Sequence, residues 1–149
     1  MNQLMALYGF NRGIKNRRFE TVTNAANTES TIYIYDMIVS DALTAEWMGG
    51  VDAQTFVNAL SAITAPTIHI RINSPGGDVF AARAIEQSIK THPSNIIAHI
   101  DGVAASAATY IALAADEIRA NEGALFMIHN AWTQTAGDSR DLTATANLL

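Results

Sequence analysis

Apolar and polar positions along this chain follow the two-residue period of a strand in some segments and the 3.6-residue period of a helix in others, and the two kinds of segment alternate. Residues 31–39 (TIYIYDMIV) are rich in β-branched and aromatic side chains, which predicts a strand. Over residues 52–63 the apolar side chains recur at helical spacing, which predicts a helix with one inward face. Residues 67–72 (TIHIRI) alternate and predict a second strand, which runs into a turn cluster at residues 73–77 (NSPGG).

The same order continues in the second half of the chain. Asp78 is the predicted N-cap of a helix that ends near Lys90, because an Asp side chain accepts hydrogen bonds from the free N–H groups at a helix start. The pattern then predicts a strand, a tight turn beginning at Gly102, a helix of small residues, two short strands and a last helix, over residues 95–101, 102–105, 106–115, 118–120, 124–128 and 138–149.

This alternation predicts an α/β domain over residues 31–149 with a mostly parallel sheet. Residues 1–30 are polar and show no period, so we expect an irregular N-terminal arm. Sites on such sheets lie beyond the carboxyl ends of the strands. The two turns described above fall there, and so does His129, which follows a predicted strand.

Composition narrows the classes of function. The net charge of −5, with acidic residues spread along the chain, argues against nucleic acid or an anionic membrane as the main partner. The absence of cysteine excludes disulfides, thiolate zinc sites and thiol nucleophiles. No two of the four histidines have the spacing of a helical metal pair, and no apolar run reaches the roughly 18–20 residues that span a bilayer. We expect a cytoplasmic protein with no metal and no cofactor.

The segment GVAASAA at residues 102–108 is suited to nucleophilic chemistry. Ser106 follows a predicted strand and opens a predicted helix, and its small neighbours let a substrate approach the hydroxyl. Free N–H groups at a helix start favour the oxyanion of a tetrahedral intermediate. Taken alone, however, the motif fits a plain N-cap serine better.

Two further motifs supply the remaining groups for such chemistry. Gly76 and Gly77 permit a positive φ and close backbone approach, so a peptide N–H there could be a second oxyanion donor, although an ordinary loop explains this motif alone. His129 can take a serine proton near neutral pH. The other histidines fit structural or solvated positions: His69, His99 and His92.

Residues 72–77 (INSPGG), 102–107 (GVAASA) and 127–129 (MIH) resemble, in this order and at nearly this spacing, three signature segments of the ClpP family of serine peptidases. Three short motifs in register seldom occur by chance. The resemblance implies an α/β fold of the ClpP/crotonase type, built from repeated ββα units. It implies Ser106 as nucleophile and His129 as general base. It also implies an oxyanion hole made by the backbone N–H groups of Gly77 and Ala107.

The third member of the family's triad is an Asp roughly fifty residues beyond the histidine, where it orients the imidazole. This sequence ends twenty residues after His129. Asp138 and Asp141 come too early, and acids at a helix start explain them better. We therefore expect the triad Asp and most of the family's C-terminal handle to lie outside these 149 residues, which leaves this chain weakly active or inactive.

Departures from the family's pattern indicate one branch of it. Ala107 stands where the family often has Met, and Asn130 and Ala131 replace the usual Gln-Pro. With the N-terminal arm, these differences resemble the head-maturation proteases of phages and prophages. That resemblance implies polypeptide substrates such as capsid or scaffold proteins, a homo-oligomer built as a heptameric ring, and a location in the cytoplasm or a procapsid. An AAA+ ATPase is a further candidate partner, whereas nucleic acid and membrane are not expected.

Three alternatives stay open at this point. Signal peptide peptidase has a similar turn around its serine but uses a Ser–Lys dyad, and the two lysines of this chain, Lys15 and Lys90, lie in the arm and at a helix end. A crotonase-type acyl-CoA enzyme shares the fold but has no need of a serine paired with a histidine. A non-catalytic assembly protein would not need to keep both Ser106 and His129.

Overall fold

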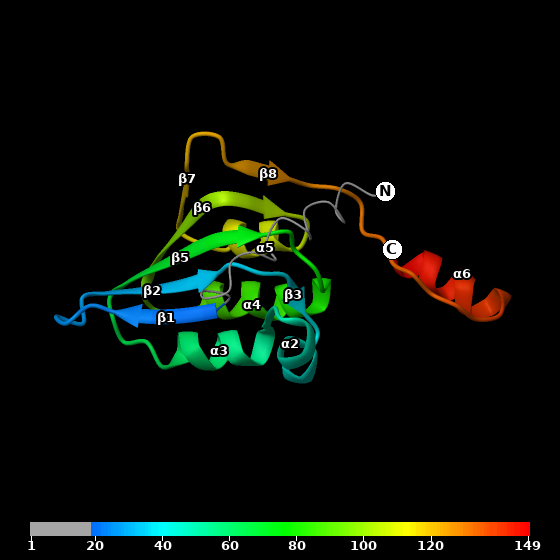
Figure 1. The fold of residues 1–149 in the computed structure, drawn as a ribbon, viewed down its shortest axis with the longest axis horizontal. Helices are drawn as coiled ribbons and strands as arrows, with labels where there is room; N and C mark the ends of the chain where they lie inside the picture. Colours follow the sequence, from blue (N-terminus) through cyan, green and yellow to red (C-terminus); the bar gives the residue numbers. More distant parts are fainter. Residues whose placement is uncertain (1–18) are drawn as a thin grey trace.

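Strands and helices alternate along the chain as the periodicity predicts (Figure 1). The computed structural model describes residues 19–149. Its strands are β1 (Phe19–Thr23), β2 (Glu29–Ile34), β3 (Ile38–Val39), β4 (Val51–Asp52), β5 (Thr67–Ser74), β6 (Asn95–Ala105), β7 (Glu117–Ala120) and β8 (Leu125–Met127). Its helices are α2 (Ala42–Met48), α3 (Ala53–Ser61), α4 (Val79–Thr91), α5 (Ala108–Leu113) and α6 (Ser139–Leu148).

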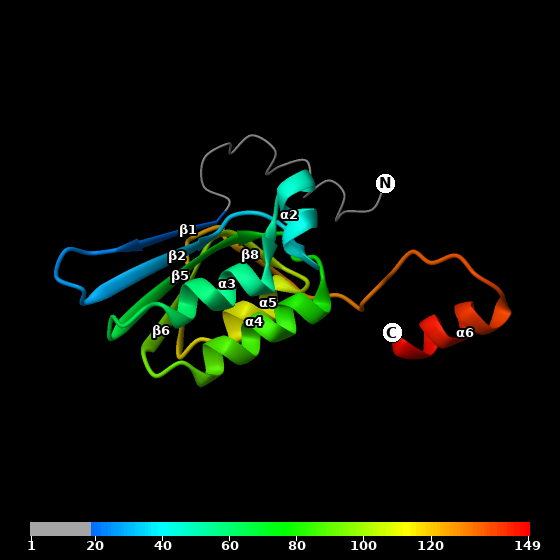
Figure 2. The same cartoon turned by 90° about the horizontal axis from the view of Figure 1, so that it is seen from below.

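The main sheet has the strand order β1-β2-β5-β6-β7, and β8 also pairs with β6 beyond the end of β7. Strands β2, β5, β6, β7 and β8 are parallel, whereas β1 is antiparallel to β2. Helices α3, α4 and α5 lie on one face of this sheet (Figure 2). The prediction of an α/β domain with a mostly parallel sheet is confirmed. Within the described residues, no helix combines the length and apolarity needed to cross a bilayer.

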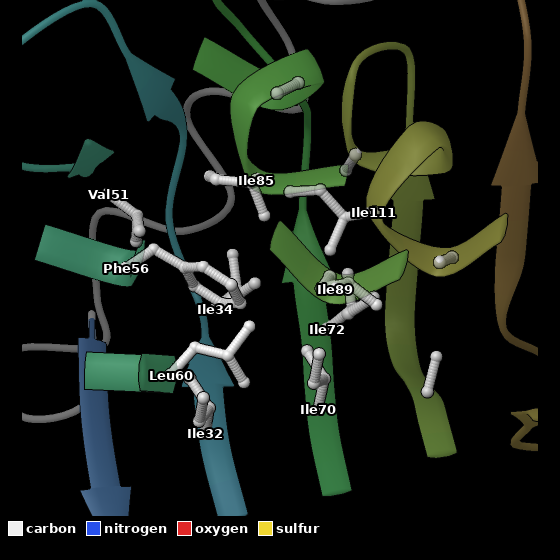
Figure 3. Packing of buried hydrophobic residues seen from close by; sticks show 14 of the residues in the cluster. Ile32, Ile34, Val51, Phe56, Leu60, Ile70, Ile72, Ile85, Ile89 and Ile111 are labelled. Atoms are coloured by element: carbon white, nitrogen blue, oxygen red, sulfur yellow. The ribbon is translucent and has the colours of Figure 1, made fainter. Parts of the chain in front are cut away.

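Isoleucines on the helix-facing side of the sheet form the centre of the core (Figure 3). In β5 the buried positions alternate strictly with half-buried ones, because successive side chains of a strand point to opposite faces. Phe56 and Leu60 of α3 pack onto this layer and are almost fully buried. Each such side chain contributes about 1.5–3 kcal/mol when it leaves water. The core therefore holds the strands in register up to their carboxyl ends, where the predicted site residues lie.

Aspartates begin four of the helices. Their side chains accept a hydrogen bond from a free backbone N–H in the first turn, as predicted for Asp78, which accepts from Ala81 N–H at 2.7 Å. The four N-cap residues are Asp41, Asp52, Asp78 and Asp138. The periodicity does not predict helix α2. This helix is only 7 residues long and buries none of its side chains, so it is too short to show a clear period.

The N-terminal segment differs from the prediction. The expected irregular chain up to residue 30 is wrong for residues 19–30, where β1 forms a hairpin with β2. Its edge position explains the polar sequence, because an edge strand needs few apolar side chains. Phe19 anchors it, with its ring centroid 6.2 Å from that of Phe56. The rest of the expected arm, residues 1–18, lies outside the described residues.

The tight turn predicted at Gly102 is also wrong. Strand β6 continues through Gly102 to Ala105, and the chain turns only at Ser106. A Cβ on Gly102 would lie 2.7 Å from Oδ1 of Asn73 on the neighbouring strand, so a larger residue here would require the Asn73 side chain to move. The single strand expected over residues 31–39 is likewise divided into β2 and β3.

Candidate active site

Ser106 occupies a sharp turn between β6 and α5. Its φ of 53° lies in the left-handed region, which is uncommon for a residue other than glycine and costs about 1–3 kcal/mol. Neighbouring groups fix it there. Its N–H donates to the carbonyl of Met127 at 2.8 Å, and its own carbonyl accepts from the N–H and the hydroxyl of Thr109, at 3.0 and 2.6 Å. The helix begins two residues later than predicted, at Ala108, so Ser106 is not an N-cap.

His129 reaches Ser106 because β6 and β8 are parallel neighbours. Ala105 pairs with Met127, and the hydrogen bond from Ser106 to Met127 extends the ladder by one rung. Both chain segments then leave the sheet at the same edge. Nε2 of His129 lies 2.7 Å from Oγ of Ser106, which is hydrogen-bonding distance. Both side chains are half-buried, so the pair remains open to a substrate.

Gly76 lets the loop after β5 lie directly against the serine turn. Its φ is +85°, and a Cβ placed on it would meet the carbonyl oxygen of Ala105 at 2.4 Å and the nitrogen of Ala107 at 2.7 Å. No side chain fits in that space. The hydroxyl of Ser74 accepts the N–H of Gly76 at 3.1 Å and so helps to hold the loop in this position.

The loop after β5 also forms a backbone bridge with β3, and the N–H of Gly77 takes no part in it. Ile38 donates to the carbonyl of Gly76 and accepts from the N–H of Asp78, both at 2.9 Å, so the bridge does not use the N–H of Gly77. Among the described residues, neither this N–H nor that of Ala107 donates to a backbone carbonyl. Both residues border the hollows beside Ser106.

Two hollows meet at the Ser106–His129 pair. The larger one, of about 300 Å³, lies toward β3 and α2, and Gly77, Asp78 and Trp132 are among its lining residues. The smaller one, of about 140 Å³, lies toward α5 and is lined mainly by apolar groups, including Leu113 and Ile128. Together they form a cleft that could hold an extended chain across the serine.

The two aspartates near the chain end are occupied in starting α6. Asp138 accepts from the N–H groups of Arg140 and Asp141, and Asp141 accepts in return from the N–H of Asp138 at 3.1 Å. This capping box confirms that they are helix-start acids. Within residues 19–149, no carboxylate hydrogen-bonds to His129.

The other histidines lie away from the pair, as predicted. His69 and His99 are neighbours on β5 and β6, with Nδ1 and Nε2 2.9 Å apart, on the sheet face opposite the helices. Burial, and then the charge of His69, lower the pKa of His99. His92 follows α4, and its Nδ1 accepts from the N–H of Ser94 at 3.2 Å.

A polar cluster on the same sheet face belongs to none of the motifs described above. The Nε of Arg71 donates to Asp101 at 2.8 Å, and the hydroxyl of Tyr35 donates to the same carboxylate. Burial and the hydrogen bond to Asp101 raise the pKa of Tyr35, and Asp101 also raises the pKa of Arg71. In both β5 and β6, polar side chains alternate with buried apolar ones. Two neighbouring strands with this pattern place their polar side chains on one sheet face, and this signal could have revealed the cluster.

A family model described as Clp protease matches residues 14–149. The chain belongs to the Clp protease family. An uncharacterized protein of Methanocaldococcus jannaschii is 31% identical to this family member over 115 residues, which are 76% of this chain and 38% of that protein. The chain thus spans well under half the length of this curated relative.

Solved structures agree with the ClpP/crotonase-type fold predicted for this Clp protease family member. A ClpP1 mutant from Listeria monocytogenes is similar with a TM-score of 0.55 and 24% identity, over 83% of this chain and 65% of that one. An enoyl-CoA hydratase from Polaromonas sp. is similar with a TM-score of 0.52 and 18% identity, over 72% of this chain and 49% of that one. At these identities the likeness concerns the fold alone.

Proposed function

We propose that this Clp protease family member hydrolyses peptide bonds, with Ser106 as nucleophile and His129 as general base. The observation that carries the proposal is the 2.7 Å contact between Nε2 of His129 and Oγ of Ser106 at the edge of the cleft. Enoyl-CoA hydratases share the fold, but hydration of a double bond has no need of a serine held against a histidine. The pair therefore favours the peptidase.

The proposed reaction begins when Oγ of Ser106 attacks the scissile carbonyl carbon. Nε2 of His129 takes the hydroxyl proton and then gives it to the leaving amine. The carbonyl oxygen becomes an oxyanion, which the N–H groups of Gly77 and Ala107 stabilise as hydrogen-bond donors. Collapse of this intermediate breaks the C–N bond and leaves an acyl-enzyme on Ser106. Water, activated by His129, then releases the acid.

We further propose that the triad is completed by an Asp that lies beyond these 149 residues. A serine protease needs an acid at Nδ1 of its histidine to fix the tautomer and stabilise the imidazolium, and replacing that acid costs about four orders of magnitude in turnover. Asp138 and Asp141 are occupied in the capping box. This chain by itself should therefore cleave peptides barely above background.

The family also supports proposals about assembly and substrates. We propose a homo-oligomeric ring, heptameric as in the family, acting on polypeptides such as phage capsid or scaffold proteins, in the cytoplasm or a procapsid. An AAA+ ATPase is a candidate partner. Exposed apolar side chains, among them Trp47 at 82% and Phe80 at 72%, are available for contacts between subunits.

A fluorophosphonate probe tests the nucleophile directly. We expect labelling at Ser106 that is lost in Ser106→Ala and strongly slowed in His129→Ala, while Ser61→Ala, at an exposed serine closing α3, labels normally. The absence of labelling in the intact protein would instead favour a non-catalytic assembly module.

The triad proposal needs a second comparison. A longer chain that extends through the expected Asp should cleave peptides far faster than residues 1–149 alone, and Ser106→Ala should abolish that cleavage. Equal rates for the two lengths would mean that Asp138 or Asp141 must be reconsidered as the acid.

A further inference from the structure

Asp78 is the only acidic residue among the described residues that line the larger hollow beside Ser106. Its side chain is half-buried and follows directly after Gly77, one of the proposed oxyanion donors. The remaining lining is apolar or neutral apart from His129, and includes Val39, Val79 and Trp132. The described lining of this hollow therefore includes one acidic residue, which adjoins the proposed oxyanion donor Gly77 in the chain.

The Asp78 carboxylate is only partly used by the fold. Oδ1 accepts from Ala81 N–H as the cap of α4. Within residues 19–149, no Lys or Arg forms an ion pair with it, since Arg83 and Lys90 of the same helix both pair with Glu86. The second carboxylate oxygen, Oδ2, has no hydrogen-bond partner among the described residues.

From this arrangement we infer that Asp78 sets the substrate specificity of the cleft, favouring peptides with a lysine or arginine close to the scissile bond. This inference rests on the proposed peptidase function. A long basic side chain suits the site because its aliphatic stem can pack on apolar residues such as Val79 and Trp132 while its charged end reaches Asp78. An acidic side chain in the same place would face the carboxylate and be disfavoured.

The charge of Asp78 can be removed by substitution without removing the helix cap. Asparagine caps a helix as well as aspartate, so Asp78→Asn removes the charge while retaining a side-chain oxygen for Ala81. Asp78→Ser is a second neutral cap in case the first variant folds poorly. Asp138→Asn is the matched control, because it removes the same charge from the N-cap of α6, outside the hollow.

Binding is measured in the Ser106→Ala background, so the result does not depend on turnover. The probes are fluorescent hexapeptides that are neutral except for one lysine placed at each position in turn, with norleucine and glutamate versions of each, and binding is followed by fluorescence anisotropy. At one position we expect lysine to bind roughly two- to fivefold more tightly than norleucine, as for a partly screened ion pair. About 0.5 M salt should weaken this preference.

The neutral caps at Asp78 should abolish the lysine preference, and Asp138→Asn should retain it. The inference is overturned if lysine binds no better than norleucine at any position in the Ser106→Ala protein. It is also overturned if the lysine preference survives both substitutions at Asp78, or if these substitutions weaken the binding of lysine, norleucine and glutamate peptides by the same factor. Failure of the peptidase proposal would be recognised separately, by the absence of probe labelling at Ser106 in the unmodified protein.

Discussion

At the scale of single residues, the site depends on backbone conformations that most side chains would prevent. Ser106 has a positive φ, and Gly76 and Gly77 have φ values of +85° and +146°. Because Gly76 has no side chain, the loop after β5 touches the turn after β6 directly, whereas Gly77 lies against Ile38 of β3. The two proposed oxyanion donors, Gly77 and Ala107, belong to the two chain segments that meet here.

Substitution of Gly76 tests how strictly the contact is required. In Gly76→Ala the new methyl group would collide with backbone atoms of Ala105 and Ala107, in a conformation that is itself unfavourable for alanine. We expect a loss of about 2–5 kcal/mol in the free energy of unfolding. Urea denaturation measures this loss, and probe labelling of Ser106 should slow with it.

Gly123 provides the matched control. Its φ is +81°, but a Cβ there would meet nothing within 4 Å. Gly123→Ala should therefore cost only the backbone strain, about 1 kcal/mol, and leave labelling unchanged. A similar loss in both variants would mean that strain, and not contact with the serine turn, explains the effect of Gly76→Ala.

The sequence was sufficient to predict which residues come together, but not how. The motif order brought Ser106, His129 and the two glycines to one sheet edge, because carboxyl ends of parallel strands share that edge. The positive φ of Ser106 could not be predicted, since serine has no intrinsic preference for it and only the surrounding hydrogen bonds hold it there. Asp78 was recognised as a cap, but its place in the cleft depends on packing between distant loops.

At the scale of elements, burial distinguishes α3 from α2, although α6 was predicted without burying any side chain. Helix α3 buries Phe56 and Leu60 and was predicted nearly to its ends, whereas α2 buries no side chain and was missed. Strand β6 was predicted too short because Gly102 and the small residues after it look like a turn. Local composition cannot show that a neighbouring strand will pair with them.

Because α3 buries apolar side chains and α2 does not, we expect the loss of their N-cap aspartates to affect stability unequally. Asp52 accepts from Thr55 N–H at 2.9 Å and Asp41 accepts from Thr44 N–H at 2.8 Å. We expect Asp52→Ala to lower the free energy of unfolding by about 1–2 kcal/mol, because α3 carries part of the core. Asp41→Ala should melt α2 locally, with faster amide exchange there and a global stability changed by less than about 0.5 kcal/mol. Equal global losses would show that α2 is more tightly coupled to the core than its exposure implies.

At the scale of the whole molecule, stability should depend on pH through the face of the sheet that the helices leave uncovered. The pKa of His99 lies below its ordinary value of 6.5, mainly because of burial. Below about pH 6.5 the unfolded chain therefore binds more protons than the folded one, and stability falls as the pH decreases. Hydrogen bonds from Lys90 and Arg83 lower the pKa of Glu86, whose contribution is lost only at more acidic pH, below its ordinary value of 4.5.

Urea midpoints between pH 8 and pH 5 measure this effect. The unmodified protein should lose stability over the lower half of the range, and His99→Gln should show a flatter profile. A profile that is unchanged by His99→Gln would assign the acid sensitivity to other groups.

The rung between Ser106 and Met127 has a consequence for the order in which the site is completed. Residues 125–129 leave the ribosome after β2, β5, β6 and the helices packed on them, and chains fold in that direction as they are made. Until β8 docks beside β6, Ser106 has neither its backbone anchor at Met127 nor the imidazole of His129. The nascent chain would therefore carry a serine hydroxyl with no base to activate it. Under the proposed peptidase function, the site therefore stays inactive at least until the strand that carries its base has been made.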